Sequence, residues 1–227
     1  MTQNLKIRIG KTNTYLLQSE FGFYILIDTS VTSGSDKLIN RLLRLGISAE
    51  KLKLIVITHS HYDHTGSLTK IKEWSGAKVL AHETAVPFLE KGITPKPIAP
   101  NPLLMKMITL HEAKNPSLSN IEPVKVDITV NSRYDLSEWG LKGYIIPTPG
   151  HTQCSISVII EAQNVFVGDT LFNITPFSIT PPIQADNAQL LRSWEILAES
   201  GSLFYHPEHG PTIPRQRFIK TLKNASK

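Results

Sequence analysis

The segment THSHYDHTG, residues 58–66, follows directly on the apolar run LKLIVI. Apolar residues on both faces of so short a run are typical of a central strand that is buried on both sides. Directly after it, His59, His61, Asp63 and His64 place four metal-binding side chains within six positions. Residues two apart in an extended chain point the same way, so His59 and His61 can reach one metal ion, while the turn that follows directs Asp63 and His64 towards a second. The chain must therefore end a buried strand at a polar site.

The types of donor atom restrict which metals fit the site, and the size of the chain indicates whether the metal is structural or catalytic. Imidazole nitrogens with carboxylate oxygens suit Zn²⁺, and Fe or Mn accept the same set. A chain of 227 residues with 41% hydrophobic residues can bury a core without a structural metal. That composition excludes the disordered class, and no apolar run is long enough to cross a bilayer. A metal bound here is therefore expected to serve chemistry.

The rest of the chain alternates between strand and helix patterns. Three short strands, LKIRI, TYLLQS and FYILIDTS, precede a helix over SDKLINRLLRLG. Helices and strands then alternate up to Gly92, and four further strands, a helix from Asp186 to Gly201 and the strand SLFYHP complete the chain. This alternation predicts an α/β fold in which helices pack outside a mixed sheet. The order of elements in the first half is loosely echoed in the second, and we expect one domain over residues 1–227.

The cluster resembles the signature of the metallo-β-lactamase-fold hydrolases, and the likeness extends over nearly the whole chain. That family has an Asp after an early strand, the HxHxDH loop, a later His, an Asp after another strand and a final His. Here Asp28 in ILIDTS, His151 in TPGHTQCS, Asp169 in VFVGDTLF and His209 in YHPEHGP match these positions in order. The resemblance implies a four-layer αββα sandwich made of two βα halves, with the metal loops at one edge of the sheets.

The resemblance also implies a ligand set for two metal ions, most simply two Zn²⁺. His59, His61 and His151 would hold one ion, Asp63, His64 and His209 the other, and Asp169 would bridge them. Asp28 would accept a ring N–H from one of the ligand histidines and so fix its tautomer. His206 competes with His209 for the last position, but the family usually has a His followed by Gly there, which favours His209.

The activity implied is that of a dinuclear hydrolase in which a metal-bridging hydroxide cleaves a thioester, a lactone or a related small ester. Asp63 would be catalytic, since it would orient the hydroxide and carry a proton to the leaving group. The segment GDTLF resembles the hydroxyacylglutathione hydrolase branch, whereas true β-lactamases generally lack an Asp at the bridging position. Three alternatives stay open: a mononuclear iron enzyme similar to sulfur dioxygenases, a true β-lactamase, and a non-catalytic metal-binding scaffold.

Four other residues near the motifs have simpler interpretations. His82 closes a predicted strand and is expected to be structural, and His111 is expected on the surface. Cys154 follows a candidate ligand by three residues but is expected to be a small buried filler, because free cysteines are usually buried and inert. Tyr62 lies between ligands and could face the substrate.

Charge and cysteine content indicate location and partners. The net charge of +5 comes from scattered lysines and arginines. We therefore expect a small-molecule substrate and do not expect a nucleic-acid partner. The single cysteine excludes an internal disulfide, and the first residues lack the apolar stretch of a secretory signal. We therefore expect a cytoplasmic location without a membrane anchor.

Residues 93–123 interrupt this pattern. Six prolines fall in this segment, together with the apolar patch LLMKMITL, and a regular sheet cannot run through it. We expect an insertion with little regular structure that covers the active-site mouth, so that the patch packs on its own domain, on a substrate acyl group or on a partner chain in a homodimer. The competing interpretation is an irregular linker that packs on the core.

Overall fold

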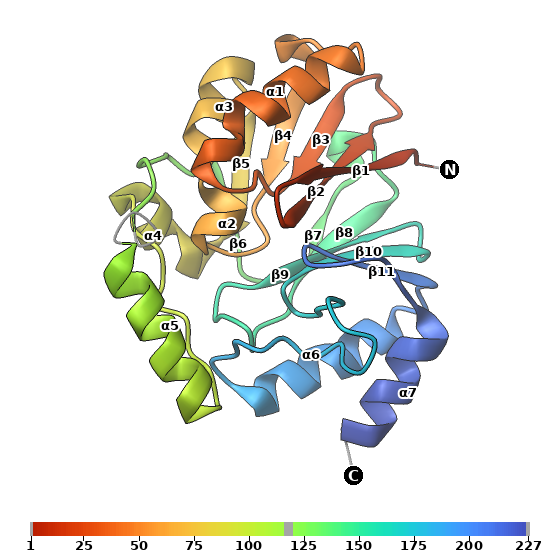
Figure 1. Ribbon diagram of the computed structural model, residues 1–227. Helices are drawn as coiled ribbons and strands as arrows, with labels where there is room; N and C mark the ends of the chain where they lie inside the picture. Colours follow the sequence, from red (N-terminus) through yellow and green to blue (C-terminus); the bar gives the residue numbers. More distant parts are fainter. Residues whose placement is uncertain (1, 116–119, 226–227) are drawn as a thin grey trace.

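Two six-stranded sheets form the centre of the computed structural model, which describes residues 2–115 and 120–225 (Figure 1). The first sheet has the order β1-β2-β3-β4-β5-β6, in which β1 to β3 are antiparallel neighbours and β3 to β6 are parallel. Its strands are β1 (Asn4–Ile9), β2 (Thr12–Gln18), β3 (Tyr24–Ile27), β4 (Leu52–Val56), β5 (Lys78–His82) and β6 (Ile128–Val130).

The second sheet has the order β12-β11-β10-β9-β8-β7. Its strands are β7 (Tyr134–Asp135), β8 (Gly143–Pro147), β9 (Ile156–Ile160), β10 (Asn164–Gly168), β11 (Phe204–Pro207) and β12 (Ile213–Pro214). Strands β8 to β10 are antiparallel, and β11 runs parallel to β10 after a helical connection. Strands β1 to β4 of the first sheet have the same arrangement. The order of elements that is echoed between the two halves of the sequence therefore corresponds to a repeated strand topology.

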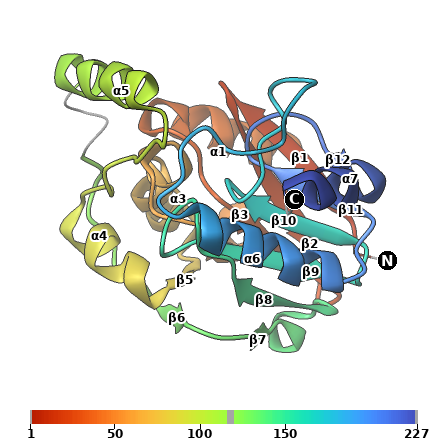
Figure 2. The ribbon, with the colours of Figure 1, turned by 90° about the horizontal axis from the view of Figure 1, so that it is seen from below.

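Helices cover the outer faces of both sheets (Figures 1 and 2). On the first sheet lie α1 (Ser35–Arg44), α3 (Leu68–Ser75) and α4 (Val86–Lys91), and on the second lie α6 (Asn187–Glu199) and α7 (Arg215–Ala225). Helix α2 (Tyr62–Thr65) is a single turn after β4, and α5 (Pro102–Lys114) lies at the periphery. Short 3₁₀ turns occupy residues 32–34, 49–51, 83–85 and 137–139.

Three apolar clusters correspond to the three interfaces between these four layers. In β4, Leu54 and Val56 belong to the cluster between the sheets, whereas Ile55 packs with the helices of the first half. Trp194 of α6 and Phe218 of α7 belong to the cluster on the outer face of the second sheet. Both faces of β4 are therefore buried, as its sequence predicted, and the predicted α/β sandwich of four layers is confirmed.

The expectation that residues 93–123 have little regular structure is wrong for residues 102–114. Helix α5 runs for 13 residues through the apolar patch. Asn101 caps it, because its Oδ1 accepts the backbone N–H groups of Leu103 at 2.9 Å and Leu104 at 3.1 Å. Pro102 stands at the first helical position, where the missing N–H costs nothing. The sequence pair Asn-Pro therefore carried a helix-start signal that the density of prolines obscured.

The predicted strand over VKVDITV is also shorter than expected, because β6 begins only at Ile128. At the preceding position, the side chain of Asp127 accepts the backbone N–H of Val79 at 2.8 Å, in place of a main-chain carbonyl. The same carboxylate forms an ion pair with Lys72.

No helix in the described part of the chain is long and apolar enough to cross a membrane.

Candidate metal centre

The predicted site residues all lie beyond the carboxyl ends of strands, at one edge of the two sheets. Asp28 follows β3, and His59 and His61 follow β4. The remaining residues are Asp63 and His64 in α2, His151 after β8, Asp169 after β10 and His209 after β11. Parallel strands carry their carboxyl ends to the same edge, so positions that are far apart in the sequence come together there.

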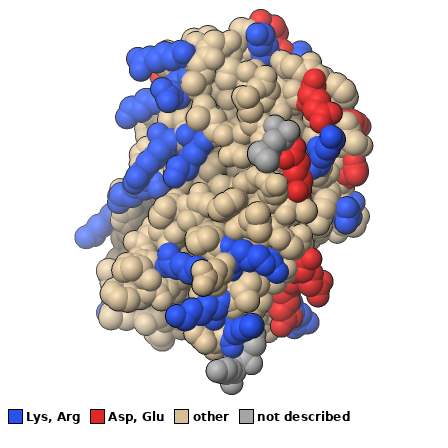
Figure 3. Space-filling model, turned by 90° about the vertical axis from the view of Figure 1, so that its right-hand side faces the viewer, with Lys and Arg blue, Asp and Glu red and all other residues tan. Residues whose placement is uncertain are grey.

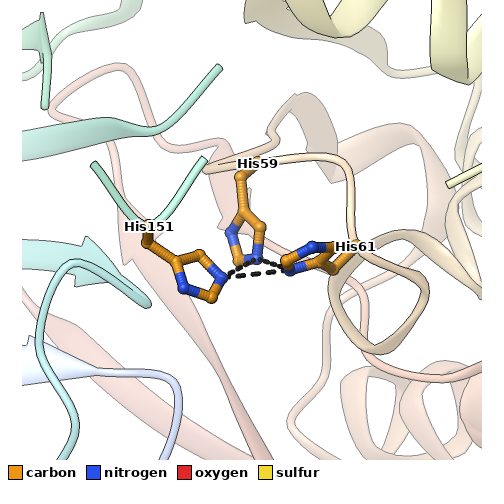
Figure 4. Close-up of side chains that lie close together, drawn as sticks. All are labelled: His59, His61 and His151. Carbon is orange, nitrogen blue, oxygen red and sulfur yellow. Dashed lines mark hydrogen bonds between the residues drawn. The ribbon is translucent and has the colours of Figure 1, made fainter. Parts of the chain in front are cut away.

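Three histidines meet in the arrangement shown in Figure 4. His59 Nε2 lies 3.0 Å from His61 Nδ1, and His151 Nε2 lies 3.2 Å and 3.0 Å from these two atoms. All three side chains are buried. We call them the three-histidine group; their ring nitrogens converge on one point, as donors do in tetrahedral metal sites.

Asp63, His64 and His209 form a second group of donor atoms, the Asp-His-His group. His209 Nε2 lies 3.3 Å from Asp63 Oδ2, and His64 Nε2 lies 3.8 Å from Asp63 Oδ1. The ring of His209 stacks on Phe172 with centroids 4.6 Å apart, which fixes its plane.

Asp169 lies between the two groups. Its Oδ2 is 3.9 Å from His59 Nε2, 3.5 Å from His151 Nε2, 3.4 Å from His64 Nε2 and 3.5 Å from His209 Nε2. One carboxylate oxygen thus faces ring nitrogens from both groups. This is the position that a bridging carboxylate needs.

Asp28 holds the loops in place from behind. Its backbone is in the left-handed region, with φ of 58°, which Asp tolerates better than most residues. Its carboxylate accepts the backbone N–H of Thr58 at 2.8 Å and the Thr58 hydroxyl at 2.5 Å, and Oδ2 lies 2.8 Å from His64 Nδ1. Asp28 therefore occupies the ligand-orienting position that the sequence predicted, while its role stays a prediction.

Gly168 lets β10 approach β4 closely enough to bring Asp169 to the site. It has φ of +53°, and a Cβ atom at this position would lie 2.6 Å from Thr58 Oγ1. Since Thr58 donates to Asp28, the glycine, the threonine and the aspartate form one packed unit. In the loop after β8, His151 Nδ1 donates to the backbone oxygen of Ile183 at 2.7 Å, which leaves Nε2 to face the other two histidines.

Burial and neighbouring charges shift the pKa values of the site residues in different directions. Burial lowers the pKa of His61 to about 3 and lowers the pKa of His59 well below its ordinary value. Burial also opposes the charged form of His64, but the carboxylates of Asp169, Asp28 and Asp63 outweigh it and raise the pKa of His64 well above its ordinary value. For Asp63, burial opposes ionisation, yet the neighbouring His64 and His209 keep its pKa below the usual range. The three-histidine group is therefore neutral and Asp63 and Asp169 are ionised, as metal binding requires, whereas His64 would have to lose a proton on binding a metal.

Two buried atoms support the fit of a divalent metal to this donor set. His64 Nε2 and Asp169 Oδ1 are buried without a hydrogen-bond partner among the described residues. Buried polar atoms are rarely left unpaired, since each costs about 1–3 kcal/mol. A metal ion beside the Asp-His-His group and Asp169 would satisfy such donors.

The sequence pattern did not single out Glu208. This side chain is completely buried directly before His209, and burial, with the nearby charge of Asp28, raises its pKa well above the ordinary value. Glu208 is therefore a neutral acid next to a candidate ligand. The only local signal was a charged residue within the rigid segment HPEHGP.

The remaining histidines lie outside both groups. His206 bonds to Thr212 and Asn164, and His82 accepts the N–H of Thr84, so both have structural partners. His111 is exposed on α5, and Cys154 is buried with its Sγ 3.4 Å from Ser60 Oγ. Each of these four positions agrees with the expectation from the sequence.

Two cavities open on the site, and Tyr62, Asp63 and His209 line both. The first, of about 480 Å³, has an apolar wall from α5 and is called the α5 cavity. The wall residues Leu104, Met107, Ile108 and His111 have the spacing of a single helix face. The second, of about 650 Å³, is bordered by the turn between β1 and β2 and is called the hairpin cavity.

Comparisons with known proteins agree with the sequence pattern. The family described as the metallo-beta-lactamase superfamily matches residues 7–209. A probable metallo-hydrolase of Methanocaldococcus jannaschii is 31% identical over 162 residues, which is 71% of this chain and 68% of that protein. A hydroxyacylglutathione hydrolase of Shewanella halifaxensis is 29% identical over 119 residues, 52% of this chain but only 33% of the relative. The chain thus spans about two thirds of one relative and a third of the other.

Solved structures show the same fold. A metallo-beta-lactamase superfamily protein from Sulfolobus tokodaii has a TM-score of 0.69 at 21% identity, covering 99% of this chain and 86% of the other. A subclass B3 metallo-beta-lactamase of Bradyrhizobium japonicum has a TM-score of 0.71 at 19% identity, covering 100% and 89%. At these identities the likeness concerns the fold alone. From the match over residues 7–209, the four-layer fold and the ordered His and Asp positions, we conclude that this chain belongs to the metallo-beta-lactamase superfamily.

Proposed function

We propose that this metallo-hydrolase cleaves a small ester or thioester with two divalent metal ions, most simply Zn²⁺. The observation that carries the proposal is the position of Asp169, whose Oδ2 faces ring nitrogens of both groups at 3.4–3.9 Å. A lone metal site does not need a carboxylate between two sets of donors. The thioester preference rests on the hydroxyacylglutathione hydrolases among the relatives and on the GDTLF segment.

The three-histidine group would hold one ion and the Asp-His-His group the other, with Asp169 shared. When bound, such ions supply a hydroxide from water near neutral pH and stabilise negative charge on a carbonyl oxygen. The neutral state of His59 and His61, which burial enforces, keeps their ring nitrogens available for this purpose. Asp28 keeps the tautomer of His64 fixed through Nδ1.

Asp63 is the residue to which we assign the proton transfer. Its carboxylate borders both cavities, and its side chain is 21% exposed, so it can reach a substrate. With its pKa held below the usual range, Asp63 is ionised at neutral pH and can accept a proton from water. It can then pass that proton to the departing thiolate or alkoxide.

The α5 cavity is the place that we assign to the acyl group. Its apolar wall removes acyl carbons from water, at roughly 0.8 kcal/mol for each buried CH₂ group. Residues 93–123, within a single domain over 1–227, would then be an insertion that forms one wall of the active site. Leu104 and Met107 are the residues of α5 best placed to contact the acyl chain.

The test is a hydrolysis screen on one metal-analysed preparation. Thioesters, lactones, carboxylic esters, phosphodiesters and a β-lactam would be assayed with the wild type and with Asp63→Asn. We expect about two metal ions per chain and turnover of a thioester or ester, with kcat reduced at least a hundredfold in Asp63→Asn. One ion per chain, unchanged by His209→Ala, would instead support the mononuclear iron alternative, and preferred turnover of the β-lactam would contradict the ester assignment.

A further inference from the structure

The two cavities beside the metal centre differ in chemistry. Among the residues that the structure describes, no lysine or arginine lines the α5 cavity, whereas Arg8 and Lys11 line the hairpin cavity. Both cavities reach Asp63 and His209, so a substrate held at the centre can extend into each. The active site therefore opens into one apolar cavity, the α5 cavity, and one basic cavity, the hairpin cavity.

The two cations of the hairpin cavity are available for a ligand. Arg8 donates from Nε to the backbone oxygen of Gly10 at 3.2 Å, its terminal N–H groups make no hydrogen bond to another described residue, and both Arg8 and Lys11 are exposed. Neither Arg8 nor Lys11 forms an ion pair with an acidic side chain in residues 2–115 and 120–225. The other polar side chains of the cavity are engaged: Thr12 contacts Ser30 Oγ at 2.6 Å, and Asn173 bonds to Pro211 and Arg217.

The basic character continues outward from Arg8. A further hollow of about 360 Å³ is lined by the basic side chains Lys6, Arg8, Lys37, Arg41 and Arg44, and none of its described lining residues is acidic. Figure 3 shows lysines and arginines gathered along one edge of the face around β1, with the acidic side chains mostly at the opposite edge. Such a field raises the local concentration of anions near the entrance of the cleft.

We infer that Arg8 and Lys11 bind an anionic group on the alcohol or thiol part of the substrate, while the acyl part lies against α5. This inference rests on the proposed function. It makes the substrate class an acyl ester or thioester whose leaving group carries a carboxylate or a phosphate. The reverse orientation would place that anion against the apolar wall of α5, where no lysine or arginine among the described lining residues compensates for its desolvation. The charge on the leaving group thus fixes the direction in which the substrate binds.

The test compares three thioesters of one hexanoyl group in the metal-loaded enzyme. The thiol parts are N-acetylcysteamine, which is neutral, 3-mercaptopropionate, which carries a carboxylate, and 4'-phosphopantetheine, which carries a phosphate. In the wild type we expect kcat/KM to be at least tenfold higher for one anionic thioester than for the neutral one, because hydrogen bonds to charged groups contribute about 1.5–3 kcal/mol each. The better of the two anionic thioesters identifies the group that the site binds.

The double variant Arg8→Gln with Lys11→Gln should reduce this ratio at least tenfold without changing metal content. Its matched control is Lys37→Gln with Arg41→Gln, which removes the same charge from the outer hollow but not from the cleft. The control should keep the ratio within twofold at 0.15 M salt. An equal loss in both variants would show a general field effect and would overturn the inference, as would a wild type without preference for either anion.

A binding measurement separates this inference from the proposed function. Analogues in which a CH₂ group replaces the thioester sulfur, with the same three end groups, would be titrated calorimetrically. If no thioester is hydrolysed but Arg8→Gln with Lys11→Gln weakens only the anionic analogues, the proposed function fails and the anion site stands. If thioesters are hydrolysed with no difference in anion binding between the variants, the proposed function stands and the anion site fails.

Discussion

Asp28 Oδ2 lies 2.8 Å from Nδ1 of His64, and both side chains are buried. The contact directs the opposite ring nitrogen of His64 towards Asp63 and Asp169. Because Asp28 also accepts two hydrogen bonds from Thr58, the position of this ring is set by β3 and β4 together.

Asp28→Asn should weaken metal binding by about 10- to 100-fold, because the amide NH₂ opposes the ring N–H that His64 now donates. Metal affinity would be measured by competition with a chelator at pH 7.5. Asp36→Asn is the control, since that exposed aspartate forms an ion pair with Lys70 far from the site. Equal affinity in wild type and Asp28→Asn would contradict an orienting role.

Asp169→Ala should reduce the affinity for both metal ions, whereas His59→Ala should remove only one of them. The reason is that Asp169 faces both groups, while His59 belongs with the three histidines in Figure 4. Elemental analysis after gel filtration gives the stoichiometry of each variant. His111→Ala, on the exposed helix α5, should keep the wild-type metal content. A variant Asp169→Ala that loses one ion and binds the other normally would argue against a shared ligand.

Leu104→Ser with Met107→Ser should raise KM for a long-chain acyl substrate by roughly tenfold and leave metal content unchanged. Leu103→Ser with Leu110→Ser makes the same chemical change on residues of α5 that are 69% and 53% exposed and do not line the cavity. We expect this second variant to keep the wild-type KM. A lower melting temperature with unchanged KM in the first variant would mean that the helix face is only core packing.

Gly168→Ala should lower the free energy of unfolding by about 2–3 kcal/mol more than Gly201→Ala does. Both glycines have positive φ, so both variants carry the strain of the left-handed region, roughly 1 kcal/mol. Only at Gly168 would the new Cβ also meet Thr58; at Gly201 nothing lies within 4 Å. Urea denaturation of the metal-free proteins measures the difference, and equal losses would show that the contact with Thr58 relaxes without cost.

His206→Gln should reduce the loss of stability in acid. Burial lowers the pKa of His206 to about 4, and Lys6 adds to the effect, so the unfolded chain binds a proton at a higher pH than the folded one. Stability is therefore complete above about pH 6.5 and falls as the pH decreases towards 4. Between pH 6.5 and 5 the wild type should lose about 2 kcal/mol more than the variant, as measured by urea denaturation. Parallel pH profiles would mean that His206 is not the group responsible.

The local parts of the site were accessible from the sequence, because one loop carries four of the candidate ligands. His59, His61, Asp63 and His64 follow a strand whose burial is evident from its composition. The distant His151, Asp169 and His209 could be placed only through the resemblance, since nothing in their own segments specifies which strand ends meet. The structure brings all seven together, while their roles as ligands stay predictions.

Other features depend on contacts that a sequence does not display. Helix α5 was missed because the six prolines of residues 93–123 outweighed the helix-face spacing of Leu104, Met107, Ile108 and His111. The strands β7 and β12 have two residues each, too few for an alternating pattern. Arg8 and Lys11 are an unremarkable pair until the turn between β1 and β2 meets residues 209–211 across the cleft.

Each candidate cluster found among the described residues takes two residues from the first half of the chain and one from the second: His59 and His61 with His151, Asp63 and His64 with His209, and His59 and His64 with Asp169. A metal ion bound by one of these clusters links the two halves of the chain. If the two sheets separate, the ligands of that ion also separate, and the metal must be released. A chain severed between the two halves would consequently leave two fragments, neither of which carries a complete cluster, and their reunion should depend on zinc.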